Sequence, residues 1–573
     1  MSMRMRFIPA AVFLFCLFAF VNSGFCALPA AQTAGGITKQ EKDIEKKKEL
    51  EKKIEAPRTA GAEASKQEVV PEDSGPKVKI TSIKVEGAAL LSSAEVQAIT
   101  GQYEGQELSF NTMQKIADLI TDEYRKKGYA TSRAYIPPQN VREGVLIIRV
   151  VEGKLGTLQI KGNRYFKTKL LEKKLHFDQQ GYFDYSALQQ AMVYINEHPD
   201  RKASATLVPG TTPGSTDVIV EIKDRMPIHV GFEYDNYGSR YIDRNRYALV
   251  FENNNLFGFD DKLYLKAMEA GQDRMHLQQG RYSFFPLDAT EIGGYFVNSK
   301  VELGKEFEDL DSEGKAQVYG LFMNHQLINS QYLDFRLTAG FDYKRLRNYQ
   351  LGSVISRDNV RVAKLGVDTD VSDNLGRTIF TVEGDQGLPG FLGGMKAKDE
   401  LATRAGSGGK FTKGLFNIYR LQPLPLETAL LWKNNAQFSN HALVASEQFQ
   451  MGGPGSVRGY APAEYSGDSG WYTSPEVSIP FYGLSKNMTV PFSDVKMYDA
   501  NRIVVFYDYA TTYLNNAQPG EKKHQCIKGW GFGWRVNVKD NFTFRVEIGY
   551  PIGHPTPADS DHAHPWVELT TKF

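Results

Sequence analysis

The chain has 573 residues, and its 68 lysines and arginines are balanced by 67 acidic residues. This length predicts several domains, and the balanced charge argues against nucleic acid as a partner. Hydrophobic residues make up 41%, which excludes a bundle of membrane helices, because each helix would need about 20 consecutive apolar residues. A membrane β-barrel is not excluded, since only every second residue of its strands faces lipid.

The N-terminal residues 1–27 are predicted to be a secretory signal peptide. Arg4 and Arg6 precede an apolar run at 7–21 that is too short to span a membrane comfortably. The chain is therefore expected to leave the cytoplasm. The cleavage point stays open, and lipid attachment at Cys26 is a weaker alternative, because the residues before this cysteine fit a lipoprotein signal poorly.

Residues 28–77 form a separate segment in front of the first folded unit. The stretch 39–55 consists almost entirely of lysine, glutamate, isoleucine and leucine. Many of its opposite charges are four residues apart, which predicts a short exposed helix. Prolines and glycines between 57 and 76 then predict a flexible linker. On the residues alone, this segment is interpreted as a solvated spacer.

Two similar units follow, at 78–153 and 154–226. The pattern I-x-V-x-G at 83–87 recurs as L-x-I-x-G at 158–162. Each pattern is interpreted as a short strand that ends in a glycine turn and leads into helices. Two further strands complete each unit, which predicts a modular α+β pair rather than one large core.

From residue 227 to 573 the hydrophobic pattern alternates with a period of two. Aromatic and aliphatic residues alternate with charged residues or glycine at 335–344, 530–537 and 542–550. A soluble β-domain also alternates, but it rarely repeats aromatic faces over so many strands. The pattern predicts a membrane barrel, and its length holds roughly 16 strands.

The last strand orients the barrel. Residues 565–573 alternate and end on Phe573. If this end is periplasmic, the turn at 539–541 is periplasmic as well, and residues 447–465 lie in an external loop.

Several motifs occur together and in a fixed order along the chain. They are G-Y-A-T-S-R-A at 128–134, I-P-P-Q at 136–139, V-V-E-G at 150–153, P-G-S-T-D at 213–217, D-N-Y-G-S-R at 235–240, N-L-F-G at 255–258 and V-R-G-Y at 457–460. This set resembles the B-component outer-membrane transporters of two-partner secretion, of the hemolysin and hemagglutinin secretion-activation type, in the Omp85 superfamily. The resemblance implies two periplasmic α+β POTRA domains, at 78–153 and 154–226, followed by an all-β transmembrane barrel of about 16 antiparallel strands at 227–573.

The resemblance also implies that the external loop folds back into the barrel lumen. In the family, the loop arginine pairs with the aspartate of an F-x-D-x-G motif; here residues 506–510 read F-Y-D-Y-A, with alanine in place of the glycine. Alternation independently directs Asp508 inward, where an unpaired charge is costly. We predict an Arg458–Asp508 pair that sets the depth of the loop, and the alternative is a solvated arginine in a glycine-rich loop. The lumen-loop motif comprises Val457, Arg458, Gly459 and Tyr460.

The resemblance offers a second interpretation of the charged helix at 39–55. Its position matches that of an N-terminal helix that plugs the pore in some family members. The charges suit a polar lumen better than lipid, so a plug and a solvated spacer both stay open.

The first unit is expected to contact the exported chain. A strand edge can accept an extended segment by β-augmentation, in which backbone hydrogen bonds make little demand on sequence. The alternative is that the motifs of this unit are turn and packing elements. The candidate recognition residues are Gly128, Tyr129, Thr131, Ser132, Arg133, Pro137 and Gln139.

No catalytic residue, cofactor or metal site is predicted. Two of the three cysteines lie in or beside the signal peptide, and the third is Cys526, so no disulfide framework or cysteine zinc site is expected. The histidines and aspartates at 554–564 lie in a proline-rich external loop, where a metal site is conceivable but not expected. The G-S-G-G-K run at 406–410 lacks the spacing of a phosphate-binding loop.

The predicted function is export of one large, extended exoprotein through a pore in the bacterial outer membrane, with POTRA recognition in the periplasm. The leading alternative is an Omp85-type assembly factor that inserts other barrels. An enzyme barrel and a passive porin are weaker alternatives. Other expected partners are outer-membrane lipid and, during biogenesis, periplasmic chaperones and the barrel-assembly machinery, with Phe573 as the C-terminal signal; no nucleic acid is expected.

Overall fold

The computed structural model describes residues 32–56, 76–175, 181–271, 273–330, 332–491 and 493–573. The predicted signal peptide over 1–27 lies outside these residues, as does most of the predicted linker. Among the residues described, no helix is both long and apolar enough to cross a membrane.

Sixteen antiparallel strands close into one barrel, which confirms the fold class expected from the alternating pattern. Each strand pairs with its neighbour along the chain, and β26 returns to β9 from Glu568↔Asp235 to Lys572↔Gly231. The strands are β9 (Ile228–Asp235), β10 (Arg246–Asn253), β11 (Lys262–Ala270), β12 (Met275–Leu287), β13 (Thr290–Glu302), β14 (Glu313–Asn329), β15 (Leu333–Gln350), β16 (Ser353–Asp373), β17 (Gly376–Gly387), β18 (Thr412–Pro423), β19 (Ala429–Ser439), β22 (Ser469–Pro480), β23 (Asn501–Tyr513), β24 (His524–Val538), β25 (Phe542–Pro551) and β26 (His564–Lys572).

The period of two separates an apolar outer face from a polar lumen. On β24, Trp530, Phe532 and Trp534 are exposed on the outside, whereas Arg535 is buried inside. The small inward residues make room for side chains from neighbouring strands. A Cβ atom on Gly531 would lie 2.4 Å from the Phe506 ring.

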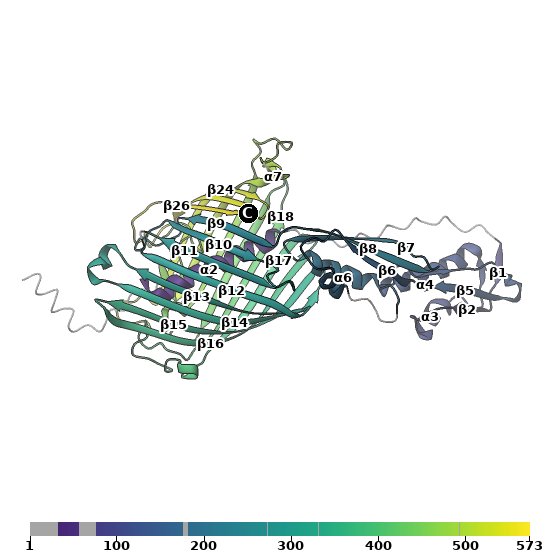
Figure 1. Cartoon of the computed structure of the whole chain (residues 1–573), viewed down its shortest axis with the longest axis horizontal. Coiled ribbons are helices and arrows are strands. Elements are labelled where there is room, and N and C mark those ends of the chain that lie inside the picture. Colours follow the sequence, from purple (N-terminus) through teal and green to yellow (C-terminus); the bar gives the residue numbers. More distant parts are fainter. Residues whose placement is uncertain (1–31, 57–75, 176–180, 272, 331, 492) are drawn as a thin grey trace, which may run out of the picture.

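Two α+β units precede the barrel, as the sequence repeat predicts, and Figure 1 shows them in a row at one end of it. We call this the inner end of the barrel, and the opposite end the outer end. In each unit, two neighbouring strands are parallel and the third is antiparallel. The first unit comprises β1 (Lys77–Lys79), β2 (Ser82–Glu86), α3 (Ser93–Thr100), β3 (Glu107–Ser109), α4 (Phe110–Lys126), β4 (Arg133–Tyr135) and β5 (Val145–Val151), and the second comprises β6 (Lys154–Lys161), α5 (Thr168–Lys174), α6 (Tyr185–Asn196), β7 (Arg201–Pro209) and β8 (Ser215–Asp224).

Helix α2 (Ala34–Glu55) runs inside the barrel (Figure 1). It begins five residues before the predicted start. The Thr33 side chain caps it by accepting a hydrogen bond from Gly36 N at 2.9 Å. Gly35 lets the helix approach the wall loop closely, because a Cβ there would lie 3.0 Å from the Ser446 Cβ. At about 1.5 Å per residue, its 22 residues extend about 33 Å, close to the thickness of a bilayer core.

The second unit is fastened to the barrel by buried ion pairs at the β10–β11 turn. The Arg201 guanidinium donates to both carboxylate oxygens of Asp260, at 2.6 and 2.8 Å. Asp200 accepts hydrogen bonds from Arg225 and from Asn254. These contacts fix the orientation of the second unit against the inner end of the barrel.

The same junction contains His198 in its neutral form. His198 Nδ1 accepts from Asp200 N at 3.1 Å, and Nε2 donates to Asn254 O at 2.9 Å. Burial, followed by the charge of Arg201, lowers the pKa of His198 from 6.5 to about 4, although Asp260 opposes this shift. Both ring nitrogens are therefore used in a way that only neutral histidine allows.

We expect acid to loosen this junction. Stability from neutral His198 is complete above about pH 6.5 and falls as the pH drops toward 4, by about 2 kcal/mol at pH 5. Hydrogen exchange of the segments 196–203 and 254–261, corrected for intrinsic rates, should speed up at pH 5 relative to pH 7. His198→Gln should abolish this extra dependence; an unchanged dependence in the variant would contradict the assignment.

Candidate functional site: the lumen loop and the internal helix

The connection between β19 and β22 at the outer end folds back into the lumen. Its base is a ribbon of two short strands, β20 (Phe449–Met451) and β21 (Tyr465–Gly467). Between them lies the V-R-G-Y motif at 457–460, in which Val457, Arg458 and Tyr460 are all buried. A tight turn shapes the tip, since Gly453 N donates to both Val457 O and Tyr460 O.

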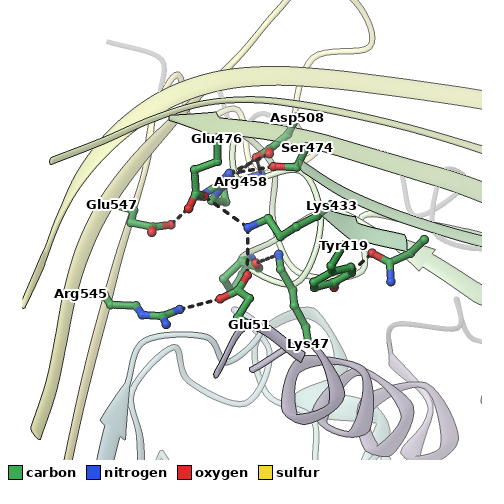
Figure 2. A network of polar contacts seen from close by, with 12 residues as sticks. Lys47, Glu51, Tyr419, Lys433, Arg458, Ser474, Glu476, Asp508, Arg545 and Glu547 are labelled. Carbon is green, nitrogen blue, oxygen red and sulfur yellow. Dashed lines mark hydrogen bonds and ion pairs between the residues drawn. The ribbon is translucent and has the colours of Figure 1, made fainter. Parts of the chain in front are cut away.

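The Arg458 guanidinium is the centre of the site (Figure 2). Its Nε and Nη2 each donate to a different oxygen of Asp508, both at 2.9 Å, and its backbone N–H donates to the same carboxylate. Nη1 lies 3.0 Å from both Glu476 and Glu547, and Nη2 donates to Ser474 Oγ. The structure therefore brings together the two residues for which the sequence predicts a pair.

The other residues of the motif are also closely packed against the barrel. A Cβ on Gly459 would lie 2.6 Å from the Tyr550 carbonyl carbon, so glycine permits the close approach to β25. Tyr460 Oη donates to Pro555 O at 2.8 Å. Ala510, which departs from the family pattern, is buried in an apolar cluster with Val457. The alanine methyl is accommodated at the position of the expected glycine.

One lysine links the loop site to the internal helix. Lys433 Nζ, on β19, lies 3.3 Å from Glu476 and 2.9 Å from Glu51 of α2, as Figure 2 shows. Lys47 of α2 also donates directly to the loop, at 3.0 Å from Pro454 O. The helix and the loop therefore share one buried polar network.

Further ion pairs hold α2 against several strands. Two of its acids are buried against wall bases, and several of its lysines are paired with acids of the barrel. The pairs include Glu41 with Arg246 and Lys266, Glu51 with Lys433 and Arg545, and Lys48 with Glu568. Charges on the helix face opposite charges on the barrel wall, and this pairing explains how so polar a helix can be enclosed in the lumen.

Sequence reasoning did not assign roles to Glu476, Glu547 or Arg535. Arg535 donates to both acids, and Arg458 contacts the same acids from the loop. The available signal was alternation, because each of these residues is an inward position of its strand. An inward charge on one strand does not by itself identify its partner on another.

A second buried acid joins the loops at the outer end. Asp468, immediately before β22, accepts hydrogen bonds from Arg404 Nη1 at 2.7 Å, Leu443 N at 2.8 Å and Asn515 N at 2.6 Å. These partners belong to three different outer connections. The folded-back loop is therefore tied to its neighbours at its base as well as at its tip.

Two predicted recognition residues make packing contacts at the end of the first unit: Gly128 contacts the second unit, and Ser132 contacts the last residue of the first. Gly128 O accepts from Tyr185 N at 2.9 Å, and a Cβ at Gly128 would meet Ser186 Oγ at 2.6 Å. Ser132 Oγ accepts from Gly153 N. These contacts favour the packing interpretation for this part of the motif.

The other candidates in the first unit have different surroundings. Gln139 acts as a strand mimic, since its amide accepts from Ile147 N and donates to Ile147 O, at 2.8 and 2.6 Å. Tyr129 packs edge-on against Tyr124. Arg133 is exposed on edge strand β4, whereas Thr131 and Pro137 are half-buried.

Two remaining features lie at opposite ends of the barrel. Phe573 is exposed, and its backbone exchanges hydrogen bonds with Val230, which continues the closing ladder. At the outer end, Asp559, Asp561 and His564 are close enough to share a metal ion. Arg244 already donates to both carboxylates, at 3.3 and 3.0 Å, so their charge is compensated.

A closed 16-stranded barrel with a folded-back arginine loop and α+β units at one end defines the class: an Omp85-type outer-membrane transporter. The family model for haemolysin secretion/activation protein ShlB/FhaC/HecB matches residues 214–536, more than half of the chain. The chain belongs to this family. A model for the ShlB-type POTRA domain matches residues 78–153. The barrel therefore lies in the outer membrane, and its inner end and the POTRA units face the periplasm.

Relatives and solved structures agree with this assignment. The heme/hemopexin transporter protein HuxB of Haemophilus influenzae is 24% identical over 497 residues, which is 84% of each chain. The structure of CdiB from Escherichia coli superposes with a TM-score of 0.75 at 20% identity, over 93% of this chain and 98% of that chain. BamA from Haemophilus ducreyi, lacking POTRA domains 1–3, shares the fold at a TM-score of 0.51 and 15% identity, over 87% of this chain and all of that one.

Proposed function

We propose that this chain exports one large exoprotein, in extended form, from the periplasm to the cell surface or medium. The observation that carries the proposal is the shared network of loop and helix around Arg458, Lys433 and Glu51. A lumen filled by two separable elements is suited to opening and closing. We assign α2 the role of a plug, and the Arg458–Asp508 pair the role of a loop anchor.

We divide the periplasmic part into POTRA domains at 78–153 and 154–226, followed by the barrel at 227–573. Recognition of the exoprotein is assigned to the first domain. Its sheet ends in edge strand β4, on which Arg133 and Tyr135 are exposed. An extended segment could pair with this edge through its backbone, with the two side chains flanking it.

The proposed mechanism needs no catalytic group, cofactor or metal, and we assign no enzymatic activity to the chain. Net movement outward would come from folding of the exoprotein outside the cell, which makes return unfavourable. Periplasmic chaperones and the barrel-assembly machinery are proposed partners during biogenesis, with Phe573 as part of the assembly signal and residues 1–27 as the export signal.

Quantitative proteomics of the culture medium and the outer membrane, with and without this chain, tests the proposal. Loss of one or two very large proteins from the medium, with outer-membrane barrels unchanged, would identify the exoprotein. A broad fall in outer-membrane barrels with an unchanged medium would contradict export and support the assembly-factor alternative, whose fold is shared by BamA.

A further inference from the structure

One connection at the inner end of the barrel is much longer than the others. Residues 481–500 separate β22 from β23, whereas the remaining inner-end connections run from two residues, at 288–289, to eight, at 254–261. Barrels of this type usually have short periplasmic turns and long external loops. The length of 481–500 therefore calls for a physical explanation.

The described residues of this connection, 481–491 and 493–500, are held together by backbone contacts. Thr489 and Lys496 form an antiparallel bridge, and Met497 N donates to Met488 O at 2.8 Å. The short helix α7 (Met497–Ala500) then leads into β23. We call residues 481–500 the inner-end hairpin.

The two neighbouring turns support the hairpin from both sides. Tyr482 Oη donates to Leu426 O at 2.7 Å, and Lys486 pairs with Glu427, both in the β18–β19 turn. On the other side, Asp494 pairs with Lys539 of the β24–β25 turn. Three consecutive turns thus form one continuous platform.

This platform displays apolar side chains that its own packing does not cover. Leu426 is 78% exposed, Tyr482 58%, Met488 55% and Phe481 42%. The Thr489–Lys496 bridge and the Met497 N to Met488 O hydrogen bond hold the backbone of the hairpin, so these side chains are presented by an organised scaffold. An exposed apolar surface of this kind marks a site of contact with another apolar phase.

Its position identifies that phase. Figure 1 shows α7 and its loop projecting sideways from the barrel near the C-terminus, rather than continuing toward the POTRA units. The platform adjoins the lipid-facing surface, where Trp432 on β19 and Trp534 on β24 are exposed on the outside of the barrel. Lys496 is exposed beside the apolar residues, where its ammonium group can reach a lipid head group.

We propose that the inner-end hairpin is a membrane-surface foot, which inserts Tyr482 and Met488 into the periplasmic leaflet of the outer membrane. An inserted foot on one side of the barrel would resist tilting and rotation of the barrel in the bilayer. Its partner is the lipid surface itself. Insertion of amphipathic segments of this kind reaches about 5–10 Å into the boundary between head groups and acyl chains.

A spin label on Met488→Cys tests the proposal in the full-length protein. The other cysteines are replaced by serine, and the protein is reconstituted in vesicles of phosphatidylethanolamine and phosphatidylglycerol. The ratio of label collisions with oxygen to collisions with a water-soluble nickel chelate reports immersion in lipid. Labels on Val505→Cys, on the lipid face of β23, and on Ala517→Cys, in an exposed outer turn, provide the two reference values.

The Met488 label should give a ratio close to that of Val505 and well above that of Ala517, because a label about 5–10 Å below the head groups is exposed to oxygen and shielded from the nickel chelate. A ratio equal to that of Ala517 would overturn the proposal. A label that is water-exposed in vesicles but becomes shielded when a polypeptide is added would also overturn it, and would assign the surface to a protein partner. Heat-modifiable migration on gels confirms that each labelled barrel is folded before it is measured.

Discussion

Asp508→Asn is expected to release the folded-back loop and to turn a closed barrel into a fluctuating channel. The substitution removes the carboxylate that takes two parallel hydrogen bonds from Arg458. Breaking one partner of a buried ion pair costs about 3–5 kcal/mol. Because Glu476 and Glu547 still contact the arginine, we expect the lower part of that range. Planar-bilayer recordings should show more frequent openings, and secretion of the exoprotein should fall.

Two further variants make this test specific. Arg458→Lys keeps the charge but cannot form the fork, so it should resemble Asp508→Asn. Asp373→Asn removes an acid that also takes two hydrogen bonds from an arginine, Arg420, but at the exposed end of β16. Exposed pairs contribute little, so this control should behave as wild type. Wild-type conductance and secretion in Asp508→Asn would refute the role of the pair.

Deletion of residues 34–55 is expected to raise the conductance of the pore severalfold. A 16-stranded barrel is wide enough to leave an aqueous channel when its lumen is empty. The barrel should remain folded, because its closed ladder does not depend on α2. Wall bases also keep partners of their own: Arg246 retains Asp235, and Lys433 retains Glu476.

A milder variant distinguishes release of α2 from the lumen from the effect of shortening the protein. Glu41→Gln combined with Glu51→Gln removes both buried acids of α2 and should increase the open probability without shortening the protein. Glu49→Gln changes an exposed acid of the same helix and should have no effect. If the double variant stays as closed as wild type, charge pairing does not hold the helix in the lumen.

Local patterns predicted the barrel well because, in a membrane-spanning strand, apolar and polar residues alternate. The alternation shows which side chains face lipid and which face the lumen. Alternation sufficed to direct Asp508 inward, and the resemblance supplied Arg458 as its partner. The start of α2 was missed because Gly35 and Gly36 usually disfavour a helix, whereas here Gly35 permits close packing on a loop more than 400 residues away.

The partners of α2 were beyond sequence reasoning for a related reason. The pairs Glu41–Arg246 and Glu51–Arg545 join residues that are distant in the chain, and many inward charges could have served equally well. In the first unit, by contrast, conspicuous motif residues were assigned a role in recognition that their contacts do not support. Gly128 and Ser132 stood out as candidates for recognition, yet their contacts are with the backbone and side chains of the unit boundary.

The charged lining of the lumen has a consequence for the passage of a polypeptide. A plug held by apolar contacts would expose an apolar lumen wall when it moved away, and apolar side chains of a passing chain would adhere to that wall. Here the vacated wall presents groups such as Arg246, Lys433 and Glu476, which water can hydrate, so much of the desolvation penalty of the closed state is recovered. A passing chain would then slide along a hydrated surface that offers its apolar side chains little to adhere to.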